Sequence, residues 1–264
     1  MIYLSTFQLS NRKLKNPNIY PYSVFRNKYI EPFVFDPITV LYGNNGSGKS
    51  TVLNIIADKL KLKGREHAVS DSYGIVNYFD QFVSECSFGI ETYRLPEESM
   101  YLKSEDVLYE IKKAQQSEVL SEGMVYDLMK EGKGLKEAKA FVSSLKGEMI
   151  KDNLLFNSEK HSNGETAMMF FEEHLQPDAL HLLDEPEVSL SPESQVELAD
   201  RINELTRLLG CQFIIATHSP FLLGTLNAKI YNLDTTDYNV MPWYRLENVR
   251  YFYEFFRKHE SDFE

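Results

Sequence analysis

A phosphate-binding pattern lies at residues 43–50, which read Gly-Asn-Asn-Gly-Ser-Gly-Lys-Ser. Glycines let such a loop curl so that backbone N–H groups face a triphosphate, while the lysine reaches the β- and γ-phosphates and the serine hydroxyl binds Mg²⁺. We therefore expect a nucleoside triphosphate here, with Lys49 and Ser50 in these roles. A chance match in a turn is the alternative, but only 13 residues of the chain are glycine. The residues expected to surround the nucleotide are Gly43, Asn44, Asn45, Gly46, Ser47, Gly48, Lys49, Ser50 and Thr51.

Two carboxylates follow the apolar run at residues 180–183. A carboxylate at the end of a strand beside a phosphate loop holds Mg²⁺ directly or through water, and this is the role expected of Asp184. The next side chain points elsewhere, so Glu185 is the expected base for the water that attacks the γ-phosphate. An acidic turn after a core strand is the ordinary alternative.

A histidine follows another apolar run, at residues 213–216. A single histidine after a strand is more often structural than catalytic. One helix and a return strand fit between Glu185 and His218, which brings both residues to the same edge of a parallel sheet. We therefore expect His218 to contact the γ-phosphate and to sense whether hydrolysis has occurred.

The elements around these motifs predict an α/β fold. The strand 38–42 precedes the phosphate loop and a helix follows it, and then a helix (165–175), a strand (179–183), a long helix (192–209) and a strand (213–216) alternate. Such alternation implies a parallel sheet with right-handed crossovers. Residues 1–42 suit short strands and turns, and residues 88–157 suit a helical subdomain that includes helices at 104–116 and 135–149.

The composition and net charge of the chain limit the partners and the cellular compartment that we expect for it. The chain has 264 residues, 43 % of them hydrophobic, and a net charge of -11. This charge argues against broad wrapping around nucleic acid, although a local basic patch is compatible with it. Cys86 and Cys211 lack metal-ligand spacing and are expected to be reduced, which favours the cytoplasm. No apolar run is long enough to span a bilayer and no signal peptide is evident, so direct membrane insertion is not expected.

Taken together, these motifs resemble those of the ATP-binding-cassette (ABC) ATPases over most of the chain. The order is the phosphate loop (Walker A), a glutamine loop, a signature loop, the Asp-Glu strand (Walker B), a D-loop and a switch histidine. More narrowly, the motifs resemble small stand-alone bacterial ATPases of the AAA or ABC type that are related to the recombination and structural-maintenance cassettes. The resemblance implies one domain over residues 1–264, divided into a β-rich part (1–87) with antiparallel strands, a helical subdomain (88–164) and a final part (165–264), around a mixed or parallel sheet.

The resemblance also assigns roles to residues outside the phosphate loop. The signature loop comprises Ser162, Asn163, Gly164 and Glu165. It would cover the ATP of a second protomer, so that two ATP molecules close a head-to-tail dimer. A plain capping box explains Ser162 and Glu165 equally well on their own. Residues 189–191 would form the D-loop. Gln81 would touch Mg²⁺ and the attacking water, or it is an ordinary polar residue at a strand end.

The leading hypothesis is a cassette-type ATPase that uses ATP and Mg²⁺ to drive an unidentified protein partner or a nucleic-acid process such as repair or defence. The alternatives are the nucleotide-binding subunit of a membrane transporter and a non-catalytic, nucleotide-controlled interaction module. The signature departs from Leu-Ser-Gly-Gly-Gln, which argues against the transporter. The sequence does not choose between ATP and GTP. The aromatic residues that compete to stack on the base are Tyr20, Tyr22, Phe25 and Tyr29.

The C-terminal end is rich in aromatic residues. We expect most of them to lie in the core, with any surplus forming a patch for a partner. These residues are Trp243, Tyr244, Tyr251, Phe252, Tyr253, Phe255 and Phe256.

Overall fold

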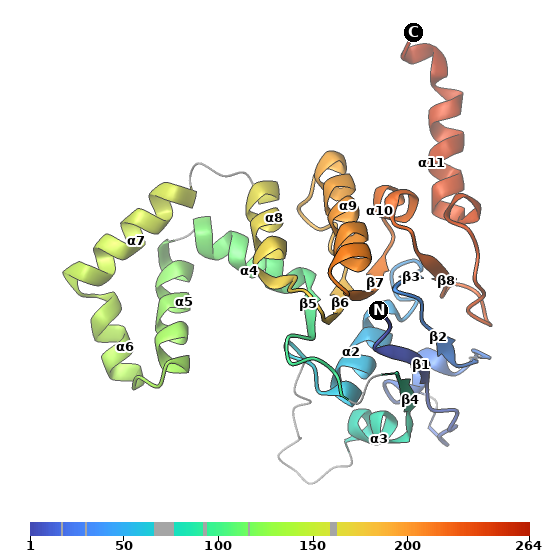
Figure 1. Cartoon of the computed structure of the whole chain (residues 1–264), viewed down its shortest axis with the longest axis horizontal. Helices are drawn as coiled ribbons and strands as arrows, with labels where there is room; N and C mark the ends of the chain where they lie inside the picture. The colour runs from blue at the N-terminus through green and yellow to red at the C-terminus, as the bar shows by residue number, and fades with distance from the viewer. Residues whose placement is uncertain (17, 30, 66–76, 92–93, 116, 159–162) are drawn as a thin grey trace. The chain divides into compact units, whose positions relative to one another are not determined.

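The computed structural model describes residues 1–264 except 17, 30, 66–76, 92–93, 116 and 159–162 (Figure 1). The side chains of 113–115, 117–119 and 152–158 also lie outside the description. The chain forms two compact units. The first comprises Met1–Lys103, Gln176–Glu187 and Gln195–Glu264, and the second comprises Ser104–Leu175 and Val188–Ser194.

A five-stranded parallel sheet is the centre of the first unit, with strand order β5-β6-β7-β3-β8 (Figure 1). Every residue of β3, β6 and β7 is buried. Strands covered on both faces read as nearly continuous apolar runs, which is why the sequence marked these three. The strands are β3 (Ile38–Tyr42), β5 (Met100–Lys103), β6 (Leu180–Asp184), β7 (Gln212–Thr217) and β8 (Lys229–Asn232).

Helix α2 carries the apolar face that follows the phosphate loop. Its buried residues include Val52, Leu53 and Ile56, which recur at helical spacing, and it packs on β5, β6, β7 and α3. The helices of this unit include α1 (Tyr22–Phe25), α2 (Lys49–Leu60), α3 (Tyr78–Glu85), α9 (Pro192–Leu208, whose first residues belong to the second unit) and α10 (Pro220–Thr225).

An antiparallel sheet completes the β structure, with the order β2-β1-β4. It consists of β1 (Leu4–Gln8), β2 (Phe33–Val34) and β4 (Ser87–Ile90). The buried Gln212 side chain joins it to the central sheet, because its Oε1 accepts from the N–H groups of Tyr3 (2.8 Å) and Leu4 (2.9 Å). The expected α/β class, with a parallel sheet and an antiparallel part, is confirmed.

The second unit is helical. It contains α4 (Ser104–Gln115), α5 (Ser117–Lys130), α6 (Leu135–Val142), α7 (Leu145–Ser158) and α8 (Asn163–His174). The single helix expected over 135–149 is two helices. Ser144 breaks it, since its Oγ accepts from the N–H of Gly147 at 3.2 Å and so begins α7 as a cap. A side chain at Gly147 would collide with the carbonyl oxygens of Phe141 and Val142, so only glycine fits there.

Residues 88–103 differ from the sequence-based expectation of a helical stretch beginning at 88. They contribute to β4 and form β5, and the helices begin at Ser104. Strand β5 pairs with β6 in parallel, from Met100 opposite His181 to Lys103 opposite Asp184. A four-residue strand at the edge of a sheet carries too short a pattern to be recognised without its partner.

The C-terminal aromatic residues are not core residues, which corrects the expectation. They lie on η1 (Trp243–Arg245) and α11 (Glu247–Lys258), before η2 (Glu260–Asp262), and all seven are exposed. Aromatic content alone does not reveal whether a packing partner lies within the same chain. None of the helices in the described part of the chain is both long and apolar enough to cross a bilayer.

Candidate functional site

Three polar segments meet at the carboxyl edge of the central sheet. Strand β7 lies between β3 and β6, and the register pairs Tyr42 with Thr217 and Asp184 with Ala216. The residues that follow the strands therefore emerge within one register position of each other: Gly43 after β3, Glu185 after β6 and His218 after β7. Brought together from distant parts of the chain, these segments form the crevice in which open α/β sheets bind ligands.

The phosphate loop leads into α2 through glycines that other residues would strain. Gly48 caps the helix with φ +97°, and a Cβ there would lie 2.7 Å from Cγ1 of Val24. Gly46 has φ +84°, but no atom lies within 4 Å of its Cβ position. Glycine is thus required at 48 for conformation and space, and at 46 for conformation alone.

Lys49 is buried beneath the loop that it is expected to serve. Its Nζ donates to the carbonyl oxygen of Gly43 at 2.8 Å and lies 3.6 Å from Oε1 of Glu185. Oε1 of Glu185 also lies 3.8 Å from Nδ1 of His218. Lys49, the expected phosphate ligand, and His218, the expected sensor, therefore both approach the same carboxylate oxygen of Glu185, the expected base. A pocket of about 450 Å³ at this point is lined by Val24, Asn45, Gly46, Gly48, Lys49, Ser50, Thr51 and Glu185.

Glu185 is held in an uncommon backbone conformation. Its φ is +48°, and its N–H donates to the carbonyl oxygen of Ala216 at 2.9 Å. A non-glycine residue in this region marks a constraint imposed by its surroundings. Here the turn after β6 stays hydrogen-bonded to β7 while the Glu185 side chain reaches the phosphate pocket.

Glu187 is a site residue that the sequence reasoning missed. Its buried Oε1 accepts from Oγ1 of Thr217 (2.7 Å) and from the N–H of His218 (3.1 Å), and it lies 3.4 Å from Nδ1 of His218. This carboxylate fixes the turn that carries the histidine. The sequence did hold one signal for Glu187: it lies two residues after Glu185, on the same turn at the end of β6.

Asp184 and Ser50 supply oxygen atoms of the kind that Mg²⁺ prefers. Asp184 is buried at the end of β6, and Oδ2 accepts from the hydroxyl of Tyr101 at 3.2 Å. Ser50 lines the phosphate pocket. Among the described residues, no three His, Cys, Asp or Glu side chains form a metal-binding group. These residues fit an ion that takes one or two protein oxygens and completes its shell with phosphate and water.

Two residues outside the recognised motifs brace the phosphate loop. Oδ1 of Asp234 accepts from the N–H of Asn44 at 2.9 Å, and Nδ2 of Asn248 donates to Oδ1 of Asn44 at 2.9 Å. The N–H of Asn248 also donates to the hydroxyl of Tyr42 at 3.3 Å. The first turn of α11 is therefore tied to the loop. No sequence signal could have revealed these contacts, because they depend on how β8 and α11 return to β3.

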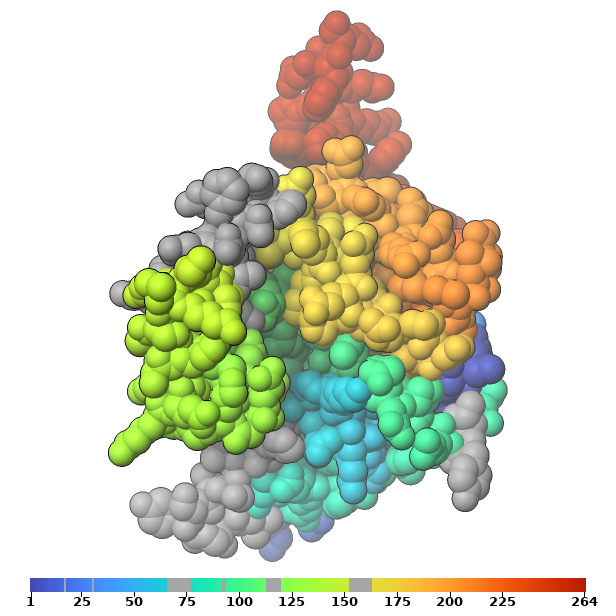
Figure 2. Space-filling model, turned by 60° about the vertical axis from the view of Figure 1, so that its left-hand side comes forward, coloured from blue at the N-terminus to red at the C-terminus, as the bar shows by residue number. Residues whose placement is uncertain are grey.

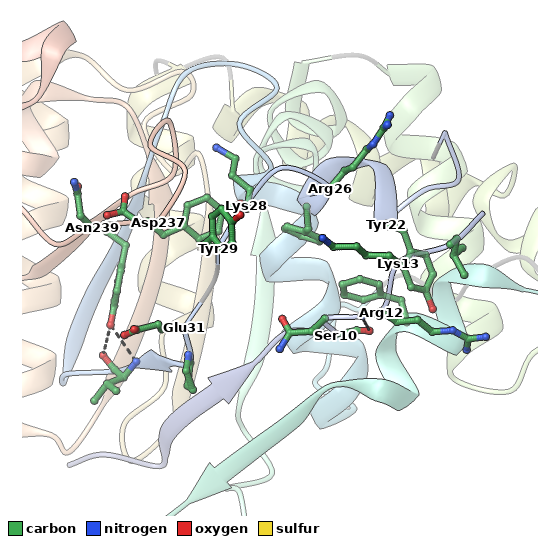
Figure 3. Close-up of a pocket in the computed structure, with 18 of the residues that line it drawn as sticks. Ser10, Arg12, Lys13, Tyr22, Arg26, Lys28, Tyr29, Glu31, Asp237 and Asn239 are labelled. Atoms are coloured by element: carbon green, nitrogen blue, oxygen red, sulfur yellow. Dashed lines mark hydrogen bonds between the residues drawn. The ribbon is translucent and has the colours of Figure 1, made fainter. Parts of the chain in front are cut away.

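A second cavity, of about 1110 Å³, lies on the other side of α1 (Figure 3). Phe25 lines it, while the neighbouring Val24 lines the phosphate pocket, so α1 borders both. Arg12, Lys13 and Arg26 lie toward one end of the view in Figure 3. Lys28 lies nearer the middle of this view, where its Nζ donates to the carbonyl oxygens of residues 233 and 235 at 2.9 Å each, and burial lowers the pKa of Lys28.

The candidates for stacking on the base separate by burial. Tyr22 and Phe25 pack on Phe82, with ring centroids 4.8 Å and 5.4 Å apart. Burial, together with a hydrogen bond to Glu85, raises the pKa of Tyr22 to about 12. Both rings therefore serve the core. Tyr20 and Tyr29 have exposed rings.

The remaining predicted residues are not brought to this pocket. Gln81 lies within α3, not at a strand end, and is not among the residues that line the phosphate pocket. Ser162 lies outside the described residues, and Asn163, Gly164 and Glu165 begin α8 in the second unit. In the expected D-loop, Ser189 has φ +67°, and Oγ of Ser191 accepts from the N–H of Ser194 at 3.1 Å, which caps α9.

Comparison with known proteins gives one family match, at residues 127–224, to the family described as "AAA domain, putative AbiEii toxin, Type IV TA system". The match covers fewer than half of the residues but includes Asp184, Glu185 and His218. A comparison with curated proteins gives no match.

Matches among solved structures include SMC head domains and a cassette from an ABC transporter. The Smc head domain with an extended coiled coil, bound to the C-terminal domain of ScpA and derived from Pyrococcus furiosus, has 14 % identity and a TM-score of 0.43, covering 97 % of this chain and 100 % of that one. The SMC head domain from Thermotoga maritima has 11 % identity and a TM-score of 0.40, covering 91 % and 99 %. A nucleotide-free ATP-binding cassette from an ABC transporter has 15 % identity and a TM-score of 0.43, covering 88 % and 87 %.

The phosphate loop after β3, the Asp-Glu pair after β6 and the histidine after β7 thus lie at one edge of a parallel sheet, and the segment that matches the AAA-domain family model, residues 127–224, contains the last two of these motifs.

Proposed function

We propose that this protein binds ATP with Mg²⁺ and hydrolyses it to ADP and phosphate in the pocket between the phosphate loop and Glu185. The observation that carries the proposal is the convergence of Lys49, Glu185 and His218, with Nζ of Lys49 at 3.6 Å and Nδ1 of His218 at 3.8 Å from the same carboxylate oxygen. A cation, a base and a hydrogen-bonding ring at the end of an anion-binding loop are the groups that phosphoryl transfer to water requires.

Each side chain has a distinct task in this proposal. Lys49 exchanges its contacts with Gly43 and Glu185 for the β- and γ-phosphates. Glu185, released from Lys49, accepts a proton from the water that attacks the γ-phosphorus. The bond from that phosphorus to the bridging oxygen of ADP then breaks. Mg²⁺, held by Ser50 and Asp184, would neutralise charge on the phosphates. Positioning and charge neutralisation thus supply most of the catalysis.

His218 is proposed to sense the γ-phosphate, and Glu187 to position it. With Glu187 facing Nδ1, a proton on that nitrogen leaves Nε2 to face the nucleotide. The contacts of Glu187 with Thr217 and with the His218 backbone keep the turn in place while Glu185 changes partners.

We further propose that two protomers close head to tail around two ATP molecules, each signature loop (162–165) completing the partner's site. The described parts of this loop begin α8, and a helix N-terminus favours an anionic ligand. Closure and opening would then drive a protein partner. The family description, which names a toxin of a toxin–antitoxin system, supports a role in defence over one in transport.

Sedimentation velocity on the Glu185→Gln variant tests the closed pair. We expect ATP and Mg²⁺ to convert a large fraction of this variant to the closed head-to-tail pair. The pair should last longer than that of the wild type, because ATP binding is retained while turnover is blocked. Asn163→Arg, placed on the signature segment, should prevent that conversion without changing the affinity of one chain for ATP. If ATP leaves the sedimentation coefficient of Glu185→Gln unchanged, the sandwich is wrong, although ATP hydrolysis by one chain could still hold.

A further inference from the structure

Asn44, the second residue of the phosphate loop, is held by side chains from two distant segments. The Asp234 carboxylate accepts from the N–H of Asn44 with Oδ1 (2.9 Å) and Oδ2 (3.2 Å), and Oδ2 also accepts from Nδ2 of Asn44 (3.1 Å). From α11, Nδ2 of Asn248 donates to Oδ1 of Asn44 at 2.9 Å. The N–H and the side chain of one loop residue are therefore engaged outside the loop.

The carbonyl oxygen of Asn44 faces the inside of the loop. It accepts from the N–H of Ser47 at 3.0 Å and from Nζ of Lys49 at 3.4 Å, and so closes the turn through which the loop curls. Gly46 and Gly48, both with positive φ, give the loop conformational freedom. A clamp on Asn44 restricts that freedom in advance, which lowers the entropy lost when the loop closes around phosphate.

The turn that carries Asp234 is itself fixed. The N–H of Asp234 donates to Oδ1 of Asn232 at 3.0 Å, within the turn after β8. Nζ of Lys28 donates to the two carbonyl oxygens that flank Asp234, at 2.9 Å each. Burial lowers the pKa of Lys28 and the Asp234 carboxylate opposes this change, so the two charges interact. The carboxylate is therefore presented to Asn44 in a defined position.

The charge of Asp234 is unfavourable where it stands. It lies at the start of a loop that is expected to bind a triphosphate, and like charges repel. Its hydrogen bonds to Asn44 act in the opposite sense, because they hold the loop in its curled form. Lys28 reduces the repulsion by placing a cation beside the carboxylate. Charge and hydrogen bonding at this one side chain thus predict opposite effects on ATP affinity.

We propose that Asp234 is a positioning residue, which tightens ATP binding by holding Asn44, and that Lys28 keeps Asp234 in place. This inference rests on the proposed ATP site. Asn248 assists from the first turn of α11. Beyond that turn the helix projects from its unit, and every residue of 250–264 is exposed, as Figure 1 and Figure 2 show. Lys28 also lines the second cavity, so one wall of that cavity contributes to ATP affinity through Asp234.

Isothermal titration calorimetry with Mg²⁺ and the non-hydrolysable ATP analogue AMP-PNP tests the sign of the effect. Asp234→Ala should weaken binding by about fivefold to 30-fold, although it removes a negative charge. Asp234→Asn should restore most of the affinity, because its carboxamide oxygen still accepts from the N–H of Asn44. If charge alone acted, both variants would bind more tightly. Asp237→Ala is the matched control, since it removes an exposed charge three residues further along and should change the affinity by less than about twofold.

Double variants test whether the residues act through one another. Lys28→Met should weaken binding by about threefold to tenfold in the wild type and have little further effect in Asp234→Ala. Lys13→Met, which removes a cation from the same cavity, should have the same small effect in both backgrounds. Asn248→Ala should weaken binding in the wild type but not in Asn44→Ala, which already lacks the acceptor oxygen.

Steady-state phosphate release separates positioning from general damage. Asp234→Ala should raise KM while kcat stays within about twofold, because Glu185 and His218 follow other strands. Circular dichroism checks that each variant is folded. Asp234→Ala that binds AMP-PNP as tightly as the wild type, or Asp234→Asn that binds as weakly as Asp234→Ala, would overturn this inference alone. A wild type that does not bind AMP-PNP would instead overturn the ATP site and this inference with it.

Discussion

Nζ of Lys49 lies 3.6 Å from Oε1 of Glu185, which joins the lysine of the phosphate loop to the carboxylate at the end of β6. Without a triphosphate, each of these groups is the nearest opposite charge for the other. A γ-phosphate would take over Lys49 and leave Glu185 facing the attacking water. In the proposed mechanism, Lys49 and Glu185 therefore exchange partners when ATP enters.

Replacing Lys49 by methionine should lower the affinity for ATP by about 30-fold to 1,000-fold, as expected for charged hydrogen bonds to phosphate that are lost in a buried site. Isothermal titration calorimetry measures this directly. Lys59→Met is the matched control on the same helix, because Nζ of Lys59 donates to the carbonyl oxygens of residues 83 and 84 instead. Equal affinities for both variants would contradict the assignment.

Two alanine substitutions in the phosphate loop should differ in cost. Gly46→Ala meets only the conformational penalty of a positive φ, about 1–2 kcal/mol. Gly48→Ala adds a contact of 2.7 Å with Val24 and should cost clearly more, while also displacing the start of α2. Urea unfolding of both variants measures the difference. Indistinguishable midpoints would show that the close approach of α1 to the loop is not as described.

Removing the Glu187 carboxylate should loosen the turn that carries His218. Glu187→Ala leaves the Thr217 hydroxyl and the His218 N–H without their acceptor, which should cost about 1–3 kcal/mol of unfolding free energy and lower kcat. Glu187→Gln keeps an acceptor oxygen and should retain most of the stability. Urea unfolding with a phosphate-release assay checks both, and the idea fails if alanine and glutamine behave alike.

Stability should depend on pH through His181. Burial lowers its pKa below 6.5, the backbone hydrogen bond to Gln176 opposes this, and the ring stacks on Phe213. The unfolded chain takes up a proton on this histidine as the pH falls below about 6.5, while the folded chain takes it up only at a lower pH. The part of the unfolding free energy that depends on a neutral His181 is therefore fully present above that pH. It declines below that pH by at most about 1.4 kcal/mol per pH unit. His181→Phe should remove this part of the slope in urea unfolding between pH 5 and 7.5, since the other groups cancel between the two proteins. If the unfolding free energy has the same slope against pH in the wild type and in His181→Phe, the prediction is wrong.

The sequence predicted the elements whose signal is local. Strand β3 was predicted at its exact bounds, and β6, β7 and α9 within one residue at each end, because buried parallel strands and capped helices carry their own pattern. Strand β5 and the break at Ser144 were missed. The first depends on pairing with β6, and the second on one serine cap within a helical pattern.

The residues of the candidate site likewise fall into those that the sequence could predict and those that it could not. The motif residues Lys49, Glu185 and His218 could be placed at one sheet edge from the order of strands alone. The bracing residues Asp234 and Asn248 could not, because they reach Asn44 from the turn after β8 and from α11, across about 200 residues of chain. The exposure of α11 was equally out of reach, since an aromatic helix looks the same in sequence whether or not its own core covers it.

Steady-state phosphate release by Glu185→Gln, measured beside its ATP affinity, tests the central claim most directly. The account predicts that turnover falls by about 10²-fold to 10⁴-fold, the range for loss of a general base, while ATP still binds. Wild-type protein that binds ATP but releases no phosphate, or a Glu185→Gln variant that turns over at the wild-type rate, would contradict it.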